Sequence, residues 1–422
     1  MEMQASKCVT PRKERIGQGP HEESSNFVFG MKRYLLAVFL WLLAASAYSW
    51  TNGDLLIWMD AERGRSLEAI SQKFKDQFGI NVWIETPENI TDSFPAAAQA
   101  GKGPDIVIWA HDKVGEWADA GLISPINLPD QFRAKYYAKA WEAVRHNSQI
   151  WGFPIGLETV ALIYNKKLLD GPPPKSLADL SDLIETIKLR HPGVFGILWD
   201  YKSAYYSWGI LASAGAYIYA KNKGGYDLKD IGVDNAGAVE GLSKIMALVD
   251  SGILPKSVSY STSEELMSQG KLAMMISGPW AWANLMKSGI DFGIAPVPGC
   301  GGSPAKPFVG VLACYINRAS PNQDIAKEFI ENFLLSEEGL KAMDEAKPIG
   351  IPSLVTLANE MERTNPLLQQ LQLCAEQGEI MPNIPEMGRF WSAVGSALQT
   401  ATNKQIPVPQ ALQEAADSMR KQ

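Results

Sequence analysis

The stretch Gly103-Pro104-Asp105-Ile106-Val107-Ile108-Trp109-Ala110-His111-Asp112-Lys113 marks the sharpest change in this chain from apolar to functional character. The Gly-Pro pair ends a loop, and the β-branched run that follows has the composition of a short buried strand. An indole ring and ionisable groups come directly after that run. Because ligands in open α/β sheets bind beyond the carboxyl ends of the strands, we expect Trp109, Asp112 and Lys113 at a binding cleft.

A second stretch repeats this arrangement later in the chain. The apolar run 272–276 predicts a strand, and Gly278-Pro279-Trp280-Ala281-Trp282-Ala283-Asn284 brings two more indoles just past it. Two strand ends that both carry aromatic side chains predict two lobes that face each other across a ligand.

The start of the expected globular part indicates the fold class. Residues 55–58 predict a strand, 66–78 a helix with apolar residues at a helical period, and 82–84 a second strand. Strand, helix and strand form the unit of a parallel sheet with right-handed crossovers, so the expected class is α/β. The loop 60–64 between the first strand and its helix carries acidic and basic groups. A solvated turn and part of a binding site are both open interpretations of it.

Further elements follow along the chain. A strand and then a short helix are expected over 162–169, and Gly171-Pro172-Pro173-Pro174 interrupts the chain before helices over 177–189. Apolar residues near 204–208 predict the start of a helix, and later helices are expected over 236–249, 321–335, 336–346, 367–377 and 390–402. The apolar run 307–312 predicts a second crossover between lobes.

Length, charge and the N-terminal segment limit the function classes. A chain of 422 residues exceeds what one hydrophobic core usually spans, so two domains are expected. Met31-Lys32-Arg33, an apolar run over 35–45 and small residues after it have the order of a secretory signal, which predicts a leader over 1–30 and a signal peptide over 31–49. Removing both leaves 33 basic and 42 acidic residues, a net charge of −9, which argues against a nucleic-acid partner.

The cysteines remaining after that cleavage do not form a disulfide framework. Cys300, Cys314 and Cys374 are odd in number and far apart in the sequence, so three free thiols and one disulfide both remain open. No cysteine lies at the expected cleavage site, which favours a freely diffusing exported protein over a lipoprotein. The sequence has no second long apolar stretch, so no membrane span is expected.

No enzyme motif with restrictive spacing is found. The chain has no phosphate-binding loop, GxGxxG, paired-histidine zinc motif or GxSxG elbow, and His111 is expected to be a structural histidine. The carboxylates of Glu62, Asp112 and Glu158 leave two interpretations open. A secreted glycoside hydrolase would use two of them as acid and base, whereas a sugar-binding protein would use them as hydroxyl acceptors beside aromatic rings.

Six runs of the sequence, spread from about Asp54 to the C-terminus, carry a resemblance to a known family. They are Gly103–Asp112, Leu162–Lys166, Gly232–Ala238, Gly278–Trp282, Lys306–Leu312 and Gly378–Pro385. In these runs the chain resembles the periplasmic maltose/maltodextrin-binding proteins of sugar ABC transporters.

The resemblance implies a hinged, two-lobe periplasmic binding protein fold of type II, with the ligand in the cleft between the lobes. It places the N-terminal lobe at 50–157 plus 312–362 and the C-terminal lobe at 158–311 plus 363–422, with Gly156 and Gly310 in the hinge. It implies a monomeric, non-catalytic periplasmic protein without a cofactor. Such a protein delivers maltose or maltodextrin to the permease subunits of an ABC transporter, and a chemoreceptor is a further partner. Another α-glucoside, trehalose or sucrose, is the alternative ligand.

The resemblance also implies a set of ligand-binding residues, some of which depart from the family pattern. Glu62 stands where the family commonly has Asp, and Arg63 and Lys113 exchange one cation for the other, which alters reach and hydrogen-bond geometry. Ser203 and Ala204 replace a Glu-Pro pair, Ser392 a Tyr and Gly395 an Arg, so an acceptor, a ring face and a donor are lost. The expected ligand-binding residues are Asp60, Glu62, Arg63, Trp109, Ala110, Asp112, Lys113, Glu158, Tyr205, Tyr260, Trp280, Trp282, Met381 and Trp391.

Overall fold

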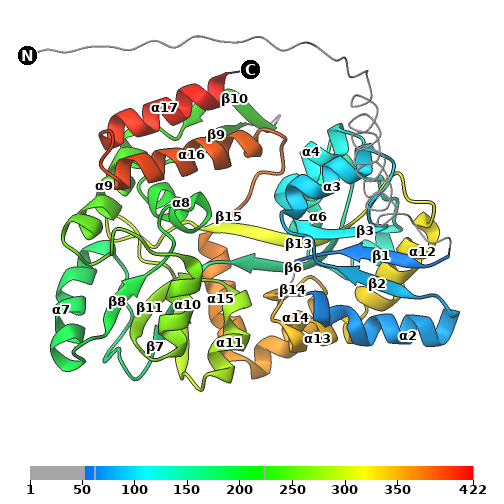
Figure 1. Ribbon diagram of the computed structural model, residues 1–422, viewed down its shortest axis with the longest axis horizontal. Helices are drawn as coiled ribbons and strands as arrows, with labels where there is room; N and C mark the ends of the chain where they lie inside the picture. Colours follow the sequence, from blue (N-terminus) through cyan, green and yellow to red (C-terminus); the bar gives the residue numbers. More distant parts are fainter. Residues whose placement is uncertain (1–52, 61–62, 223–224, 422) are drawn as a thin grey trace, which may run out of the picture. The chain divides into compact units, whose positions relative to one another are not determined.

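The structure is a computed structural model that describes residues 53–60, 63–222 and 225–421. The expected leader and signal peptide, and Glu62 among the expected site residues, lie outside the described residues. Within the described part the chain is a mixed α/β protein with two main sheets (Figure 1).

The larger sheet has seven strands in the order β14-β6-β13-β3-β1-β2, with β15 paired to β13. β1 runs parallel to both β2 and β3, whereas β13 runs antiparallel to β3 and to β6. The expected parallel unit at the start of the chain is therefore confirmed, and β13 makes the sheet mixed. The strands are β1 (Leu55–Trp58), β2 (Val82–Glu85), β3 (Ile106–Ala110), β6 (Phe153–Thr159), β13 (Phe308–Ile316), β14 (Ile351–Pro352) and β15 (Glu379–Ile380).

The second sheet has four strands in the order β12-β7-β11-β8. They are β7 (Ala161–Asn165), β8 (Phe195–Leu198), β11 (Leu272–Ser277) and β12 (Phe292–Ala295). All six residues of β11 are buried, as expected for a central strand in an apolar run. Two antiparallel pairs lie outside the main sheets: β4 (Arg145–His146) with β5 (Gln149–Ile150), and β9 (Tyr217–Asn222) with β10 (Gly225–Gly232).

Helices connect and cover the strands. The helices before β7 are α2 (Glu68–Phe78), α3 (Ile90–Gln99), α4 (Val114–Asp119), α5 (Asp130–Arg133) and α6 (Ala138–Ala143). The later ones are α7 (Leu180–Arg190), α8 (Ala204–Ser213), α9 (Ala236–Asp250), α10 (Tyr260–Ser268), α11 (Trp282–Lys287), α12 (Gln323–Glu328), α13 (Glu337–Ala346), α14 (Val355–Thr364), α15 (Pro366–Gln377), α16 (Met387–Thr402) and α17 (Val408–Arg420). A π-helix, η6 (Phe329–Leu334), continues α12.

Local sequence signals set several helix ends. The Asn235 side chain accepts a hydrogen bond from the backbone N–H of Ala238 and caps α9, and Ser336 caps α13 through the N–H of Gly339. Gly79 ends α2 in the left-handed conformation, with φ of 71°, which glycine adopts without a steric penalty. Polar caps and a glycine stop thus set the ends of helices in both cores.

Two separate hydrophobic cores share the strands β6 and β13, which lie side by side in Figure 1. On β6, Ile155 belongs to the core that contains β1 and β3, whereas Leu157 belongs to the core that contains β7 and β11. On β13 the same change occurs between Val311 and Leu312. The chain therefore crosses between its two cores at neighbouring points of one antiparallel strand pair.

Most expected elements are present, with two differences. The prediction of a short helix after the strand 162–165 is wrong. Residues 166–168 form a turn in which Asn165 accepts hydrogen bonds from backbone N–H groups. The helix expected over 321–335 is divided into α12 and the π-helix η6.

Candidate functional site

A cavity of about 480 Å³ lies beyond the carboxyl ends of β1 and β3. Residues of both cores contribute to its wall, so it adjoins the shared strands. Its lining consists of Asp60 and Arg63 after β1, Trp109, Ala110 and Asp112 at the end of β3, Glu158 on β6, Tyr205 and Tyr206 on α8, Trp280 after β11, Gly310 and Leu312 on β13, Met381 after β15 and Trp391 on α16.

One side of the cavity is an ionic group centred on Arg63. Its Nη1 lies 3.1 Å from Oδ2 of Asp60, and its Nη2 forms an ion pair with Oε1 of Glu158. The Arg63 and Glu158 side chains are each only 11% exposed, whereas Asp60 is 26% exposed. Burial raises the pKa of Glu158 and the charge of Arg63 opposes that rise. Asp60 is thus the carboxylate of this group that is most open to a ligand.

Another side of the cavity is an aromatic wall. The Tyr205 ring centroid lies 6.0 Å from that of Trp280 and 6.5 Å from that of Trp391, in tilted arrangements. Tyr206 meets Tyr205 edge to face with centroids 5.4 Å apart. Ring faces of this kind pack against the C–H faces of pyranose rings, and polar groups nearby take up the hydroxyls. Trp109 adds an indole to the cavity from the other core.

Asp112 connects the two parts of the wall. Its side chain is buried, with 8% exposed, and its Oδ2 accepts a hydrogen bond of 3.2 Å from Nε1 of Trp391. Burial raises the pKa of Asp112 to about 6, although the charge of Lys113 and the indole hydrogen bond act in the opposite direction. Asp112 therefore orients the Trp391 ring and presents a carboxyl group to the cavity.

His111, beside Asp112, has a structural role. Its Nδ1 accepts a hydrogen bond of 2.9 Å from the backbone N–H of Val311, and Nε2 lies 2.8 Å from the carbonyl oxygen of Met381. Burial lowers the pKa of His111 to about 4, so the ring is neutral and Nε2 carries the proton that is donated to Met381. The expectation of a hydrogen-bonded structural histidine is confirmed.

Three expected site residues that the structure describes do not line the cavity. Lys113 pairs with Glu116 at 2.8 Å, Tyr260 stacks on Tyr206 with centroids 6.3 Å apart, and Trp282 is only 2% exposed and its Nε1 has no hydrogen-bond partner among the described atoms. Glu62 is not described. Tyr206 was missed by the sequence interpretation, and its signal was its place beside Tyr205 in the first turn of α8.

Gly156 and Gly310 differ in their surroundings. A Cβ added at Gly156 would lie 2.6 Å from the carbonyl oxygen of Ile349, so close backbone packing requires a glycine there. At Gly310 a Cβ would meet nothing nearer than 3.7 Å. Gly310 lines the cavity and Gly156 does not.

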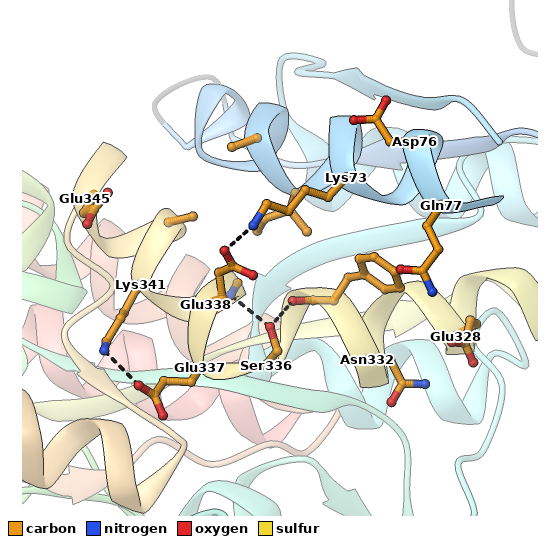
Figure 2. A pocket seen from close by; sticks show the side chains of 15 residues that line it. Lys73, Asp76, Gln77, Glu328, Asn332, Ser336, Glu337, Glu338, Lys341 and Glu345 are labelled. Atoms are coloured by element: carbon orange, nitrogen blue, oxygen red, sulfur yellow. Dashed lines mark hydrogen bonds and ion pairs between the residues drawn. The ribbon is translucent and has the colours of Figure 1, made fainter. Parts of the chain in front are cut away.

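A second, larger hollow lies between α2 and α13 and has a different chemistry (Figure 2). Its polar lining is mostly charged and includes the ion pairs of Lys73 with Glu338 and of Lys341 with Glu337. Phe333 is its one aromatic residue. This hollow lacks the aromatic wall of the cavity at Trp280 and Trp391, so that cavity is the better candidate for a sugar site.

The described residues contain no cluster of metal-binding type, no disulfide and no helix that could span a membrane. No group of three or more His, Cys, Asp or Glu side chains there is arranged to hold a metal ion. Cys300, Cys314 and Cys374 are all free and buried, which settles the question left open by their number. No helix among the described residues has the length and apolar character needed to cross a membrane.

Comparisons with known proteins agree with this chemistry. A galactooligosaccharide-binding protein of Bacillus subtilis is 29% identical over 396 residues, which cover 90% of this chain and 92% of the relative. A maltotriose-binding protein of Pyrococcus abyssi is 28% identical, covering 82% and 77% of the two chains. A maltooligosaccharide ABC transporter solute-binding lipoprotein of Streptococcus pneumoniae is 26% identical, covering 86% and 87%.

The family comparison covers most of the globular part. A sequence profile described as bacterial extracellular solute-binding protein matches residues 69–367, which include both main sheets apart from β1 and β15. The chain therefore belongs to the bacterial extracellular solute-binding protein family.

Proposed function

We propose that this protein captures a malto-oligosaccharide in the cavity between its two cores and delivers it to an ABC transporter. The observation that carries the proposal is the pairing, in one cavity, of an ionic group with an aromatic wall. A sugar needs both, because its rings have apolar faces and its hydroxyls need acceptors and donors. Relatives named for maltotriose and for malto-oligosaccharides support this class of ligand.

The residues divide into two roles. Trp109, Tyr205, Trp280 and Trp391 provide ring faces, with Met381 and Ala110 filling the apolar space between polar groups. Asp60, Arg63, Asp112 and Glu158 bind hydroxyls. The partially exposed carboxylate of Asp60 and the carboxyl of Asp112 accept hydrogen bonds from the sugar, and Arg63 holds Glu158 in place.

The fold supports closure around the ligand. We assign an N-terminal lobe to 50–157 plus 312–362 and a C-terminal lobe to 158–311 plus 363–422, because the two cores change over at β6 and β13 close to these boundaries. The shared strands then form the hinge, with Gly156 and Gly310 in it. A ligand that contacts both lobes binds the closed state more tightly than the open state, and this difference in affinity shifts the population towards the closed state.

Hydrolysis is the competing function. A hydrolase needs one carboxyl free to donate a proton and a second to attack or to activate water. Here Arg63 lies between Asp60 and Glu158 and pairs with both, which favours fixed acceptors over a proton donor. Membership of a solute-binding protein family also favours binding over hydrolysis. The partners of such a protein are the permease subunits of an ABC transporter and a chemoreceptor. Export to the periplasm follows from the same proposal.

A panel of sugars tests the proposal. Purified protein is heated with maltose, maltotriose, a galactooligosaccharide, trehalose and sucrose, and a ligand bound only by the folded state raises the melting temperature. Maltose and maltotriose are expected to give the largest shifts, with only a small difference between the two because Ser392 and Gly395 remove a ring face and a cation. The galactooligosaccharide is the main competitor because one relative is named for it. Glucose released from maltotriose on prolonged incubation would show an enzyme. A shift with none of the five sugars would overturn the ligand class.

A further inference from the structure

Gly310 lies in one of the two strands that form the proposed hinge, yet neither close packing nor backbone conformation requires a glycine there. It lies in the interior of β13, is buried and faces the cavity. A Cβ built there would lie 3.7 Å from the carbonyl oxygen of Glu158 and 4.0 Å from Cε of Met381, which are ordinary contacts. Its φ is outside the left-handed region that favours glycine. Neither backbone conformation nor crowding therefore explains the residue, in contrast to Gly156.

Its backbone polar groups do not explain it either. The carbonyl of Val309 accepts a hydrogen bond from the N–H of Met381, and the N–H of Val311 donates to His111, so the groups on either side of Gly310 face away from β6. Backbone groups alternate along a strand, and Gly310 pairs with Glu158 on β6. The position thus offers a ligand no free hydrogen-bonding group. What it offers is space.

A glycine inside a strand is a conformational disadvantage, because it has no side chain to pack and loses more backbone freedom on folding than any other residue. A buried strand glycine without a structural requirement commonly marks a place where a ligand approaches the backbone closely. Gly310 lines the same cavity as Glu158, Tyr205 and Trp391, so a ligand in this cavity can reach the backbone of β13.

We propose that Gly310 determines specificity by letting a sugar ring rest directly on the backbone of β13. A methyl group at this position occupies the volume of the ring's nearest C–H face and lifts the ring away from the acceptors at Glu158 and Asp60. The inference rests on the proposed sugar-binding function and adds a residue whose role is to provide space. A side chain at position 310 is therefore expected to weaken the binding of sugars whose ring lies flat on β13.

The test compares Gly310→Ala with Gly388→Ala. Gly388 lies on α16, is exposed, and a Cβ there meets nothing within 4 Å, so its substitution controls for the general effect of replacing glycine. Both variants are expected to unfold in urea at the same or a higher denaturant concentration than the wild type, because alanine restricts the unfolded chain. Gly310→Ala is expected to weaken maltotriose binding at least tenfold by calorimetry, and Gly388→Ala to leave it unchanged.

Two further outcomes keep the inference separate from the proposed function. Gly310→Val, with a larger side chain, should bind more weakly than Gly310→Ala while its near-ultraviolet circular dichroism stays that of the wild type. Its decrease in radius of gyration at saturating maltotriose should also match that of the wild type, and a lost decrease would assign the effect to the hinge and overturn the inference. Unchanged binding in Gly310→Ala, together with normal binding in the wild type, would overturn the role of Gly310 alone. A wild type that binds none of the sugars would overturn the proposed function and the inference together, and this is seen before any variant is made.

Discussion

The Asp112→Asn substitution is expected to weaken sugar binding while making the free protein more stable. The carboxyl oxygen that accepts from Nε1 of Trp391 becomes an amide oxygen, which still accepts that bond, so the ring keeps its orientation. What is lost is the charged acceptor facing the cavity. A hydrogen bond to a charged group contributes about 1.5 to 3 kcal/mol, so maltotriose affinity should fall about ten- to a hundredfold at pH 7.5.

The gain in stability follows from the pKa of Asp112. Folding raises that pKa from 3.8 to about 6, a preference for the protonated form of about 3 kcal/mol. At pH 7.5 the folded protein therefore bears the cost of an ionised buried carboxylate, and this cost disappears as the pH falls from about 6 to about 4, where the group is protonated in both states. Asp112→Asn should be more stable by up to about 3 kcal/mol at pH 7.5, and the advantage should vanish near pH 4.

Glu116→Gln is the matched control. It also replaces a carboxylate with an amide, but Glu116 is 41% exposed and forms a surface ion pair with Lys113, so both binding and stability should change little. Calorimetry with maltotriose and urea unfolding at pH 4, 6 and 7.5 provide the two measurements. Equal losses of affinity in the two variants, or an Asp112→Asn protein less stable than the wild type at pH 7.5, would refute the placement and ionisation of Asp112.

Further predictions concern the neighbouring histidine, the helix that carries Trp391, and closure. Folding lowers the pKa of His111 from 6.5 to about 4, so the contribution of its neutral form to stability is full above pH 6.5 and is lost as the pH falls to about 4. In the wild type, protonation of Asp112 over a similar pH range opposes this loss. Asp112→Asn removes that opposing effect, so urea unfolding should show a steeper loss of stability in acid. Gly395→Arg, one turn after Trp391 and with open space at its Cβ, should raise the affinity for maltotriose more than for maltose in calorimetry, and equal changes would place the helix face elsewhere. Saturating maltotriose should reduce the radius of gyration in small-angle scattering, and no change despite tight binding would argue against closure.

The sequence was sufficient for the elements with strong periodicity and for the residues that follow them directly. The strand before Trp109 and the strand before Trp280 were predicted from apolar runs, and the cavity lies where both end. Signals of this kind depend on residues that are close together in the sequence, so they can be read without knowledge of the tertiary structure. The turn after Asn165 was mistaken for a helix because its side-chain cap competes with helical hydrogen bonds, which a pattern of apolar residues does not reveal.

The orientation of side chains was not predictable in the same way. Trp280 and Trp282 are two residues apart, yet one lines the cavity and the other is buried in the core, because the 3-10 turn at 279–281 directs them differently. Gly156 and Gly310 looked alike as glycines in crossover strands. Only the position of Ile349, nearly two hundred residues further along the chain from Gly156, shows that one is needed for packing and the other is not.

Calorimetric titration of the wild-type protein with maltotriose tests the central claim most directly. The account predicts saturable binding of one maltotriose per chain, with the sugar recovered intact afterwards, and a loss of binding when Trp391 is replaced by alanine. Absence of binding by the folded wild type, or the appearance of glucose in the titrated sample, would contradict it.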